Sequence, residues 1–463
     1  MTLYKNDTIA AIATARGNAG VAVVRISGPE ALKITEAVFQ PSQNNVQYEH
    51  GRFYYGFIVE PQAESGGART PRSEIIIDEV IALIFKSPNS LTGEDVVEIQ
   101  CHGGDYLTHK ILNTILAQGA RMAEPGEFTK RAFLNSKMDL TQAESVMDLV
   151  SAQGDRALAA AAANLKNNTL AQYVEDTRQQ LIALQMQISA STDFPDEVDE
   201  PDRMGLKTAL MAMHQKLTAL AEGVAKNRMV REGLTVAILG LPNAGKSSVF
   251  NALLASERAI VTEVAGTTRD VITETLSIGG VPVTLVDTAG IRTGENTVEI
   301  LGIERSWQAA TAAQAVVYVY DAALGLQAED TAILLKLPHE KILSVANKSD
   351  LINGKQPDKT HLKTSVKTGE GIGRIYKFLE QDVVGEISES DTAMLLNRRQ
   401  EACLQGILEN LNLANETLVS DKQPLDLVTV PLTDALLKVD ELTGRDTREE
   451  VLDSVFSQFC VGK

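Results

Sequence analysis

The sequence predicts a multidomain protein with an α+β N-terminal domain, an α-helical bundle and an α/β domain inserted into that bundle. At 463 residues the chain is too long for one hydrophobic core, so two to four domains are expected. Helical patterns on both sides of a stretch of alternating strands and helices predict the insertion, because the ends of an inserted domain lie close together. We expect the N-terminal domain over residues 1–133, the inserted domain over 231–388, and the helical domain over 134–230 and 389–463.

The N-terminal segment mixes strand and helix patterns. Strands are expected at 20–27, 80–85 and 95–100, where Val and Ile are frequent, and a helix at 31–39. The stretch 60–73, rich in Gly, Pro, Arg and Ser, is expected to be a surface loop.

Helix signals begin at Thr141. The run Thr141-Gln142-Ala143-Glu144 is interpreted as a capping box that opens a long Ala-, Leu- and Gln-rich helical stretch, which Pro195 ends. Further helices are expected over 203–227, 390–420 and 433–459.

Composition and charge exclude several classes of protein. The chain is 44% hydrophobic and 22% charged, as in ordinary globular proteins, and its net charge of −18 argues against unaided binding of nucleic acid. The cysteines Cys101, Cys403 and Cys460 have no metal-ligand or disulfide spacing, which is typical of a reducing cytosol. Residues 1–16 lack the apolar core of a secretory signal, and no apolar run is long enough to cross a bilayer, so we expect a cytoplasmic protein.

A glycine-containing loop lies at the centre of the inserted domain. A strand at 234–239 leads into Gly240-Leu241-Pro242-Asn243-Ala244-Gly245-Lys246-Ser247-Ser248, and a helix follows at 249–254. Strand, G-x-x-x-x-G-K-S and helix form the context of a phosphate-binding loop, in which Lys246 reaches the β and γ phosphates and Ser247 ligates Mg²⁺. The alternative is a purely structural turn with a solvated lysine.

Further motifs in the expected order make a guanine nucleotide the predicted ligand. Gly266-Thr267-Thr268 can complete the Mg²⁺ shell, and Asp287-Thr288-Ala289-Gly290 ends a strand where Asp287 would hold Mg²⁺ and the Gly290 N–H would approach the γ-phosphate. In Asn347-Lys348-Ser349-Asp350, the Asp350 carboxylate can accept both hydrogen bonds that guanine N1–H and its 2-amino group donate. Ser365-Val366-Lys367 supplies a backbone N–H for the guanine O6.

The position that carries the water-orienting residue in many GTPases holds an unusual residue in this sequence. Ras-type enzymes have glutamine directly after the Gly of this motif, whereas Ile291 stands here, so Arg292, Glu295 and Glu299 are the polar candidates. The Asn243 side chain could ligate a monovalent cation beside the phosphates, or it could serve only to stabilise the loop. An arginine from a partner is a third possibility.

Three polar residues of the N-terminal domain have ordinary explanations on residue type alone. Glu98 on an apolar strand is explained by a partly exposed strand face, and Lys137 by solvation. His102 beside two glycines could be a ligand or a base, but a structural histidine is the expected role, because no second candidate ligand lies at metal-like spacing.

These motifs together resemble the MnmE (TrmE) family of bacterial tRNA modification GTPases, part of the TrmE-Era-EngA-like group, over nearly the whole chain. The resemblance also covers Val24-Arg25-Ile26-Ser27-Gly28, Thr92-Gly93-Glu94-Asp95-Val96-Val97-Glu98, Pro125-Gly126-Glu127-Phe128-Thr129, Leu134-Asn135-Ser136-Lys137, Asp193-Phe194-Pro195-Asp196-Glu197 and Cys460-Val461-Gly462-Lys463. Departures from the family pattern are small: Ala265 stands where Pro is common, and Cys101 where Gly is common.

The resemblance implies a role in tRNA modification. Together with a flavin- and NADH-dependent partner, MnmG, such a protein adds a carboxymethylaminomethyl or aminomethyl group to C5 of the wobble uridine of certain tRNAs. The N-terminal domain would bind 5-formyltetrahydrofolate or a related one-carbon donor through Arg25, Glu98, Lys137 and Lys463, which replaces the ordinary explanation of Glu98 and Lys137. A heterotetramer or larger complex with MnmG is implied. Cys460 matches a family cysteine to which we assign no catalytic role.

The resemblance also implies how GTP is hydrolysed. The N-terminal domains would form a homodimer, and the GTPase domains would meet face to face with K⁺ in place of an arginine finger. K⁺ would be held by Asn243, Thr262, Val264 and Thr267, and Mg²⁺ by Ser247 and Thr268; Glu299 would position the water and Lys246 would assist catalysis. The expected GTP contacts are Asn243, Ala244, Gly245, Lys246, Ser247, Ser248, Thr262, Glu263, Val264, Ala265, Gly266, Thr267, Thr268, Asp287, Thr288, Ala289, Gly290, Asn347, Lys348, Asp350, Ser365, Val366 and Lys367.

Two other functions are compatible with the motifs. One is a regulatory GTP switch, such as a ribosome-assembly factor, which would have no reason to bind a folate. The other is a stand-alone one-carbon transferase in which GTP is structural, which folate chemistry without MnmG would support.

Overall fold

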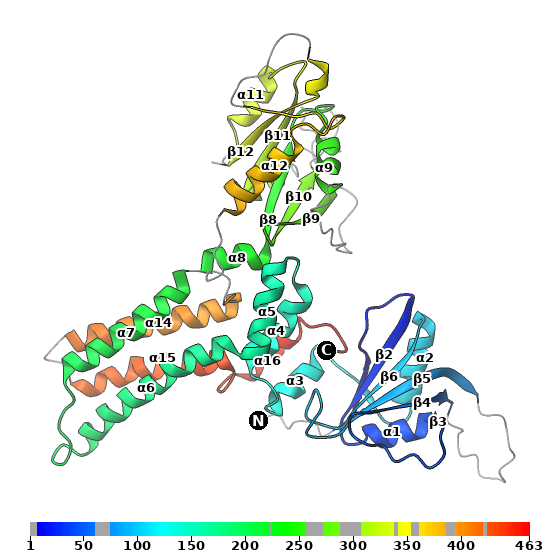
Figure 1. The fold of residues 1–463 in the computed structure, drawn as a ribbon. Coiled ribbons are helices and arrows are strands. Elements are labelled where there is room, and N and C mark those ends of the chain that lie inside the picture. Colours follow the sequence, from blue (N-terminus) through cyan, green and yellow to red (C-terminus); the bar gives the residue numbers. More distant parts are fainter. Residues whose placement is uncertain are drawn as a thin grey trace. The chain divides into compact units, whose positions relative to one another are not determined.

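The computed structural model describes residues 7–60, 75–222, 224–255, 272–287, 307–337, 341–352, 361–385, 394–419 and 424–463. The chain forms two compact units, residues 1–147 with 440–463, and residues 148–439 (Figure 1). The fold class, an α+β domain, helices and a P-loop α/β domain, is confirmed. The predicted limits of the four chain segments, 1–133, 134–230, 231–388 and 389–463, stay a prediction.

The first unit is built on a mixed seven-stranded sheet in the order β3-β4-β5-β6-β2-β1-β7. Its strands are β1 (Ile9–Ile12), β2 (Ala19–Ser27), β3 (Phe39–Pro41), β4 (Arg52–Val59), β5 (Ile76–Phe85), β6 (Val96–Gly103) and β7 (Arg121–Met122). Helices α1 (Ala31–Val38) and α2 (Asp105–Leu116) pack on one face of the sheet. Buried Val24, Ile26, Val97 and Ile99 belong to that core, so the alternate side chains of β2 and β6 lie on the opposite face.

Three more helices belong wholly or mainly to this unit. They are α3 (Glu127–Leu134), α4 (Leu140–Ser151) and α16 (Glu449–Phe456). Buried Leu140, Ala143, Leu452, Phe456 and Phe459 form a common core, which attaches the C-terminal end of the chain to the N-terminal domain.

The predicted capping box at Thr141 is wrong by two positions, because α4 begins at Leu140 and Asp139 caps it. Asp139 Oδ1 accepts the Gln142 N–H at 2.9 Å, and Gln142 Oε1 accepts the Asp139 N–H at 3.2 Å. The reciprocal bonds that define a capping box therefore join Asp139 and Gln142, and Thr141 lies inside α4.

The second unit contains the helices α5 (Asp155–Asn167), α6 (Thr169–Asp193), α7 (Arg203–Glu222), α8 (Val224–Glu232), α14 (Arg398–Val419) and α15 (Thr429–Thr443), the last of which continues into the first unit. The long helical stretch expected after Thr141 is divided: Gly154 precedes α5, and Asn168 has φ +51° between α5 and α6. The end of α6 at Asp193, before Pro195, agrees with the prediction. The helix expected over 433–459 is two helices, α15 and α16, with Gly444 at φ +84° after α15.

The α/β part of this unit has a six-stranded sheet in the order β13-β12-β11-β8-β10-β9. The strands are β8 (Leu234–Leu239), β9 (Ile272–Ile278), β10 (Val281–Asp287), β11 (Ala315–Asp321), β12 (Ile342–Asn347) and β13 (Leu362–Lys363), and only β9 pairs antiparallel. Helices α9 (Lys246–Leu254) and α12 (Ile372–Phe378) pack on one face, and α11 (Ala328–Leu334) on the other. The π-helical turn Leu379–Val384 follows α12. Burial on both faces explains why these strands are continuously apolar.

Within the described residues, no helix is both long and apolar enough to span a bilayer.

Candidate functional site

The predicted phosphate loop lies between β8 and α9, and two glycines determine its path. Gly240 and Gly245 have φ of +147° and +94°. A Cβ at Gly240 would lie 1.9 Å from the Val319 carbonyl oxygen, and one at Gly245 would lie 2.2 Å from Asn347 Nδ2. Neither the backbone conformation nor the space admits a side chain. The loop therefore ends at the N-terminus of α9, where free N–H groups and the helix dipole favour an anion.

Lys246, Ser247 and Asp287 lie close together next to this loop. The Lys246 side chain is buried, with 8% of the residue exposed, and its Nζ donates to the Leu241 carbonyl at 3.1 Å. Burial lowers the pKa of Lys246, an effect that the charge of Asp287 opposes. A buried ammonium for which the described residues offer one backbone acceptor is well suited to a phosphate oxygen.

The same residues fit a magnesium ion. Ser247 Oγ donates to Asp287 Oδ2 at 2.7 Å, while Asp287 Oδ1 is buried and has no hydrogen-bond partner in the described part of the chain. A buried carboxylate oxygen without a partner is costly unless something binds it. A hydroxyl and a carboxylate are oxygen ligands of the kind that Mg²⁺ prefers. The donor set is therefore the one expected for Mg²⁺ beside nucleotide phosphates.

The Asn347-Lys348 pair is tied directly to the phosphate loop. Asn347 ends β12, and its Nδ2 donates to the Ala244 carbonyl at 3.1 Å. Lys348 has φ +61°, and its Nζ donates to the Asn243 carbonyl at 2.7 Å and forms an ion pair with Asp321 at 2.8 Å. These bonds hold two segments that are far apart in sequence at one end of the parallel sheet.

Asp350 lies next to the second predicted base-contact segment. It is in the 3₁₀ turn Ser349–Leu351, and its Oδ1 accepts a hydrogen bond from Ser365 Oγ at 2.7 Å. Asp350 itself is exposed, whereas Ser365 is buried. Val366 is partly exposed and Lys367 exposed, beside this carboxylate. The exposed, oriented carboxylate is thus available to a ligand with paired N–H donors.

Several predicted site residues lie outside the described residues: Thr262, Glu263, Val264, Ala265, Gly266, Thr267, Thr268, Thr288, Ala289, Gly290 and Glu299, together with the alternative candidates Ile291, Arg292 and Glu295. Of the expected K⁺ ligands, only Asn243 is described. Its φ of +63° is one that Asn adopts more readily than most residues, which agrees with a loop role. The K⁺-ligand role of Asn243 stays a prediction.

In the first unit, Arg25 and Glu98 form an ion pair. They lie directly opposite each other on the antiparallel strands β2 and β6, with Arg25 Nε 2.8 Å from Glu98 Oε1. Arg25 Nη1 donates to the Gly462 carbonyl at 3.1 Å, which holds the C-terminal segment, and thus Lys463, close to this pair. The Arg25 guanidinium also lies 5.5 Å from the Phe128 ring centroid. Lys137 is exposed and donates instead to the Pro88 carbonyl at 2.9 Å.

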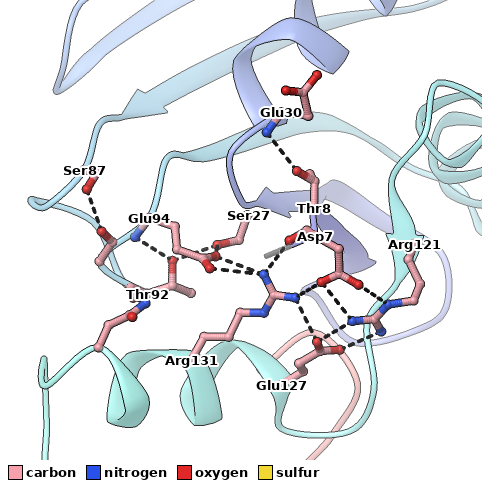
Figure 2. A network of polar contacts seen from close by, with 12 residues as sticks. Asp7, Thr8, Ser27, Glu30, Ser87, Thr92, Glu94, Arg121, Glu127 and Arg131 are labelled. Carbon is pink, nitrogen blue, oxygen red and sulfur yellow. Dashed lines mark hydrogen bonds and ion pairs between the residues drawn. The ribbon is translucent and has the colours of Figure 1, made fainter. Parts of the chain in front are cut away.

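A network of charges, which no motif identified as functional, is centred on the buried Arg131 (Figure 2). The Arg131 side chain is only 3% exposed, with Nη2 2.6 Å from Asp7 Oδ1 and Nη1 3.1 Å from Glu94 Oε1. Arg131 and Arg121 also share Glu127, at 3.0 Å and 2.6 Å. Figure 2 shows the carboxylates of Asp7 and Glu127 between the two guanidinium groups.

This network fixes the ends of the elements that carry the predicted folate residues. Ser27, two positions after Arg25, donates from Oγ to Glu94 Oε2 at 2.6 Å, and Glu94 in turn precedes Glu98 in the chain. Arg131 belongs to α3, whose C-terminal end leads to Lys137. The spacing of Glu127 and Arg131 predicts a helical pair, but nothing in the sequence indicates that Asp7 or Glu94 joins them.

The arginines also set the ionisation of two carboxyl groups. Burial raises the pKa of Asp7, but hydrogen bonds from Arg121 and Arg131 outweigh burial and leave the pKa below its usual value. For Glu127, burial likewise raises the pKa, and bonds from Arg121, the Glu124 N–H and Arg131 more than compensate, so its pKa is also lowered. Both groups are therefore carboxylates at neutral pH.

Comparison with known proteins adds an independent result. A family model described as the MnmE helical domain matches residues 140–460, and one described as the GTP-binding protein TrmE N-terminus matches residues 8–137. The chain is 37% identical over 471 residues to the tRNA modification GTPase MnmE of Acetivibrio thermocellus, which covers 100% of both chains. It is 38% identical over 467 residues to the protein of that name from Thermotoga maritima, which covers 99% of this chain and 100% of the relative.

Among solved structures, Aquifex aeolicus Era bound to GDP and AlF4⁻ matches with 24% identity and a TM-score of 0.26. The match covers 42% of this chain and 69% of that chain.

Replacing Arg131 by Met tests whether the network stabilises the first unit. Removing one partner of a buried ion pair leaves carboxylates without compensation, so we expect the free energy of unfolding to fall by roughly 3–5 kcal/mol. The measurement is urea denaturation at neutral pH, monitored by a spectroscopic signal that reports on the first unit. Lys130→Met is the matched control, because its partner Asp453 is exposed, and it should cost no more than about 1 kcal/mol.

The cost of Arg131→Met should also depend on pH. Because the pKa values of Asp7 and Glu127 are lowered on folding, their stabilisation is present above the unfolded pKa values, about 3.9 and 4.3, and is lost as the pH falls through the folded values. The difference between the wild type and Arg131→Met should therefore shrink below about pH 4. An equal difference at pH 3 and pH 7 would contradict the assignment.

Proposed function

The chain belongs to the MnmE (TrmE) family of tRNA modification GTPases, and we propose that it is the GTP-hydrolysing component of a complex that modifies the wobble uridine. It is a GTP hydrolase that acts in tRNA modification. The proposed product carries a carboxymethylaminomethyl or aminomethyl group on C5 of that uridine. The observation that carries the proposal most directly is the hydrogen bond from Ser247, at the N-terminus of α9, to buried Asp287, whose other carboxylate oxygen has no hydrogen-bond partner among the described residues.

In this proposal GTP binds at the C-terminal ends of the parallel strands. The N–H groups at the start of α9 and Lys246 would contact the phosphates, while Ser247 and Asp287 would hold Mg²⁺. Asp350, oriented by Ser365, would accept hydrogen bonds from guanine. Mg²⁺ would neutralise charge between the β and γ phosphates.

Hydrolysis is proposed to require K⁺ and dimerisation of the α/β domains. A cation held by Asn243, Thr262, Val264 and Thr267 would supply the charge that an arginine finger gives in other GTPases. Glu299 would orient the attacking water, since Ile291 has no polar atom. The same proposal includes a cytoplasmic homodimer through the N-terminal domains and a complex with MnmG.

The N-terminal domain is proposed to bind 5-formyltetrahydrofolate or a related one-carbon donor. Glu98 has a carboxylate that can accept hydrogen bonds from the amino and ring N–H groups of a pterin. Arg25 holds this carboxylate and the C-terminal segment in place, and Lys463 would face the glutamate tail of the folate. A regulatory switch has no use for such a site, so folate binding separates the two functions.

Asp350→Asn tests base selection. Asn has one acceptor oxygen and one NH₂ donor in place of the two carboxylate oxygens, so it cannot accept both hydrogen bonds that guanine donates. GTP affinity should therefore fall about 10- to 100-fold. Xanthosine triphosphate, which has an acceptor at that edge of the base, should bind more tightly. Fluorescence titration with both nucleotides is the measurement. Glu329→Gln, at an exposed position on α11, is the control. Unchanged GTP affinity would remove Asp350 from the base site.

Cation dependence is tested by GTP hydrolysis in KCl and NaCl at equal ionic strength. The wild type should be faster in KCl, and both Asn243→Ala and Glu299→Ala should lose roughly 10²-fold or more of that rate. Asn251→Ala, exposed on α9, should behave like the wild type. Equal rates in the two salts would mean that Asn243 only stabilises the loop and that a protein partner supplies the charge.

Folate binding is tested by calorimetry with 5-formyltetrahydrofolate on the full chain. Glu98→Gln keeps the size of the side chain but loses the charge and one acceptor, and should weaken binding about 10-fold or more. Glu49→Gln, which changes an exposed carboxylate, should bind normally. A wild-type protein that does not bind the folate would favour the regulatory switch.

A further inference from the structure

Strand β11 ends at Asp321, which is not among the predicted GTP contacts. β11 lies between β8 and β12 in the sheet, and Asp321 is directly opposite Asn347 in the parallel register of β11 and β12. The phosphate loop follows β8, and the predicted base-contact segment begins where β12 ends. Because these strands are parallel, their C-terminal ends lie at one edge of the sheet, and Asp321 is at that edge with both parts of the nucleotide site.

Both oxygens of the Asp321 carboxylate have a partner. Oδ1 accepts the Ala323 backbone N–H at 2.9 Å, and Oδ2 accepts a hydrogen bond from Lys348 Nζ at 2.8 Å. The Asp321 carbonyl accepts the N–H groups of Leu324 and Gly325, at 3.2 Å and 3.0 Å, which closes the turn after β11. The Asp321 side chain is 17% exposed. The turn itself therefore orients this carboxylate toward Lys348.

Lys348 carries the constraint to the phosphate loop. Its Nζ is bonded to Asp321 and also donates to the Asn243 carbonyl at 2.7 Å. A lysine side chain has a long flexible stem, and an ammonium without a carboxylate partner at a partly exposed position is free to turn into solvent. Asp321 keeps the ammonium at the loop, where its bond to the carbonyl is charge-assisted and therefore stronger than a bond between neutral groups.

The bond to Asn243 helps to shape the loop for an anion. Asn243 has φ +63° and its carbonyl accepts from Lys348, while the next carbonyl, that of Ala244, accepts from Asn347 Nδ2 at 3.1 Å. Carbonyl oxygens carry partial negative charge and repel a phosphate, so a loop that binds one must direct them elsewhere. Two consecutive carbonyls are thus tied to donors outside the loop, and Asp321 holds one of these donors in place.

We propose that Asp321 is a positioning residue for the guanine nucleotide, which fixes Lys348 and, through it, the phosphate loop before the ligand binds. The inference rests on the proposed GTP site and adds to it a residue that acts through Lys348 and not by contact with GTP. A loop that is already ordered loses less conformational entropy on binding, and such differences in affinity act mainly on the rate of release. Asp321 therefore slows nucleotide release.

The test is the release of a fluorescent GDP analogue from the full chain, measured by stopped flow with excess unlabelled GDP and constant Mg²⁺. Asp321→Asn keeps the size of the side chain and one oxygen acceptor but removes the charge. It should speed release about 10-fold and change the association rate less than about threefold. Asp321→Glu, which keeps the charge, should release the analogue more slowly than Asp321→Asn. Asp382→Asn, at an exposed position in the π-helical turn after α12, is the control and should release at the wild-type rate.

A double-mutant cycle shows whether Asp321 acts through Lys348. Lys348→Met keeps most of the stem but loses the ammonium, and should speed release by itself. Adding Asp321→Asn to Lys348→Met should then change the release rate less than about twofold, because the group that Asp321 holds is gone. If the effects of the two substitutions multiply in full, Asp321 acts by another route and the inference is wrong.

The remaining outcomes separate this inference from the site on which it rests. If the wild type binds the analogue and Asp321→Asn releases it at the wild-type rate, the Asp321–Lys348 pair is only a surface ion pair, and the nucleotide site stands without it. Failure of the wild type to bind any guanine nucleotide would remove the proposed site itself, and this inference with it. The thermal unfolding midpoint without nucleotide shows whether each variant is folded. Should Asp321→Asn not fold, Asp321→Glu takes its place in the cycle, because moving the carboxylate by one methylene also weakens its bond to Lys348.

Discussion

The first unit depends on the buried Arg131 guanidinium. An arginine that is almost wholly inaccessible to solvent is tolerated only if carboxylates surround it, and Asp7, Glu94 and Glu127 do so from three separate segments. Glu94 and Glu127 are themselves largely buried, so their charges are compensated only while the arginine is in place. The positions of β1, of the loop before β6 and of α3 therefore depend on one another.

The same principle operates at the nucleotide site with an amide and an ammonium. The Asn347 amide and the Lys348 ammonium both donate to carbonyl groups of the phosphate loop, and Asp321 balances the lysine charge. The loop is thereby fixed before any phosphate arrives, which lowers the entropic cost of binding. Asp287 Oδ1, in contrast, has no hydrogen-bond partner within the described ranges, and burying it is costly unless a ligand completes the site.

The sheets of the two units differ in which of their parts are available to a ligand. The α/β sheet buries both faces and binds its ligand at the strand ends, as open parallel sheets do. In the N-terminal sheet α1 and α2 cover one face, and Phe128 of α3 packs against Ile9 and Ala11 on the other. The proposed folate residues Arg25 and Glu98 lie on that second face. The net charge of −18 supports the proposal that a partner protein supplies much of the positive surface for tRNA.

Much of the fold and of the nucleotide site could be predicted from sequence, because short-range signals determine them. Gly240 and Gly245 are required by the loop backbone itself, and the strands before Asp287 and Asn347 are apolar because both faces are buried. Local signals failed where two candidates competed within one helical turn, as when Asp139 and not Thr141 capped α4. Contacts between distant segments had no signal at all: Asp7 with Arg131, Gly462 with Arg25, and Asp78 with His102. The sequence by itself therefore determined which residues could bind a nucleotide, through local spacing. Only the tertiary structure decided which charges are paired, because pairing depends on strand order and register, which bring together groups that are far apart in the chain.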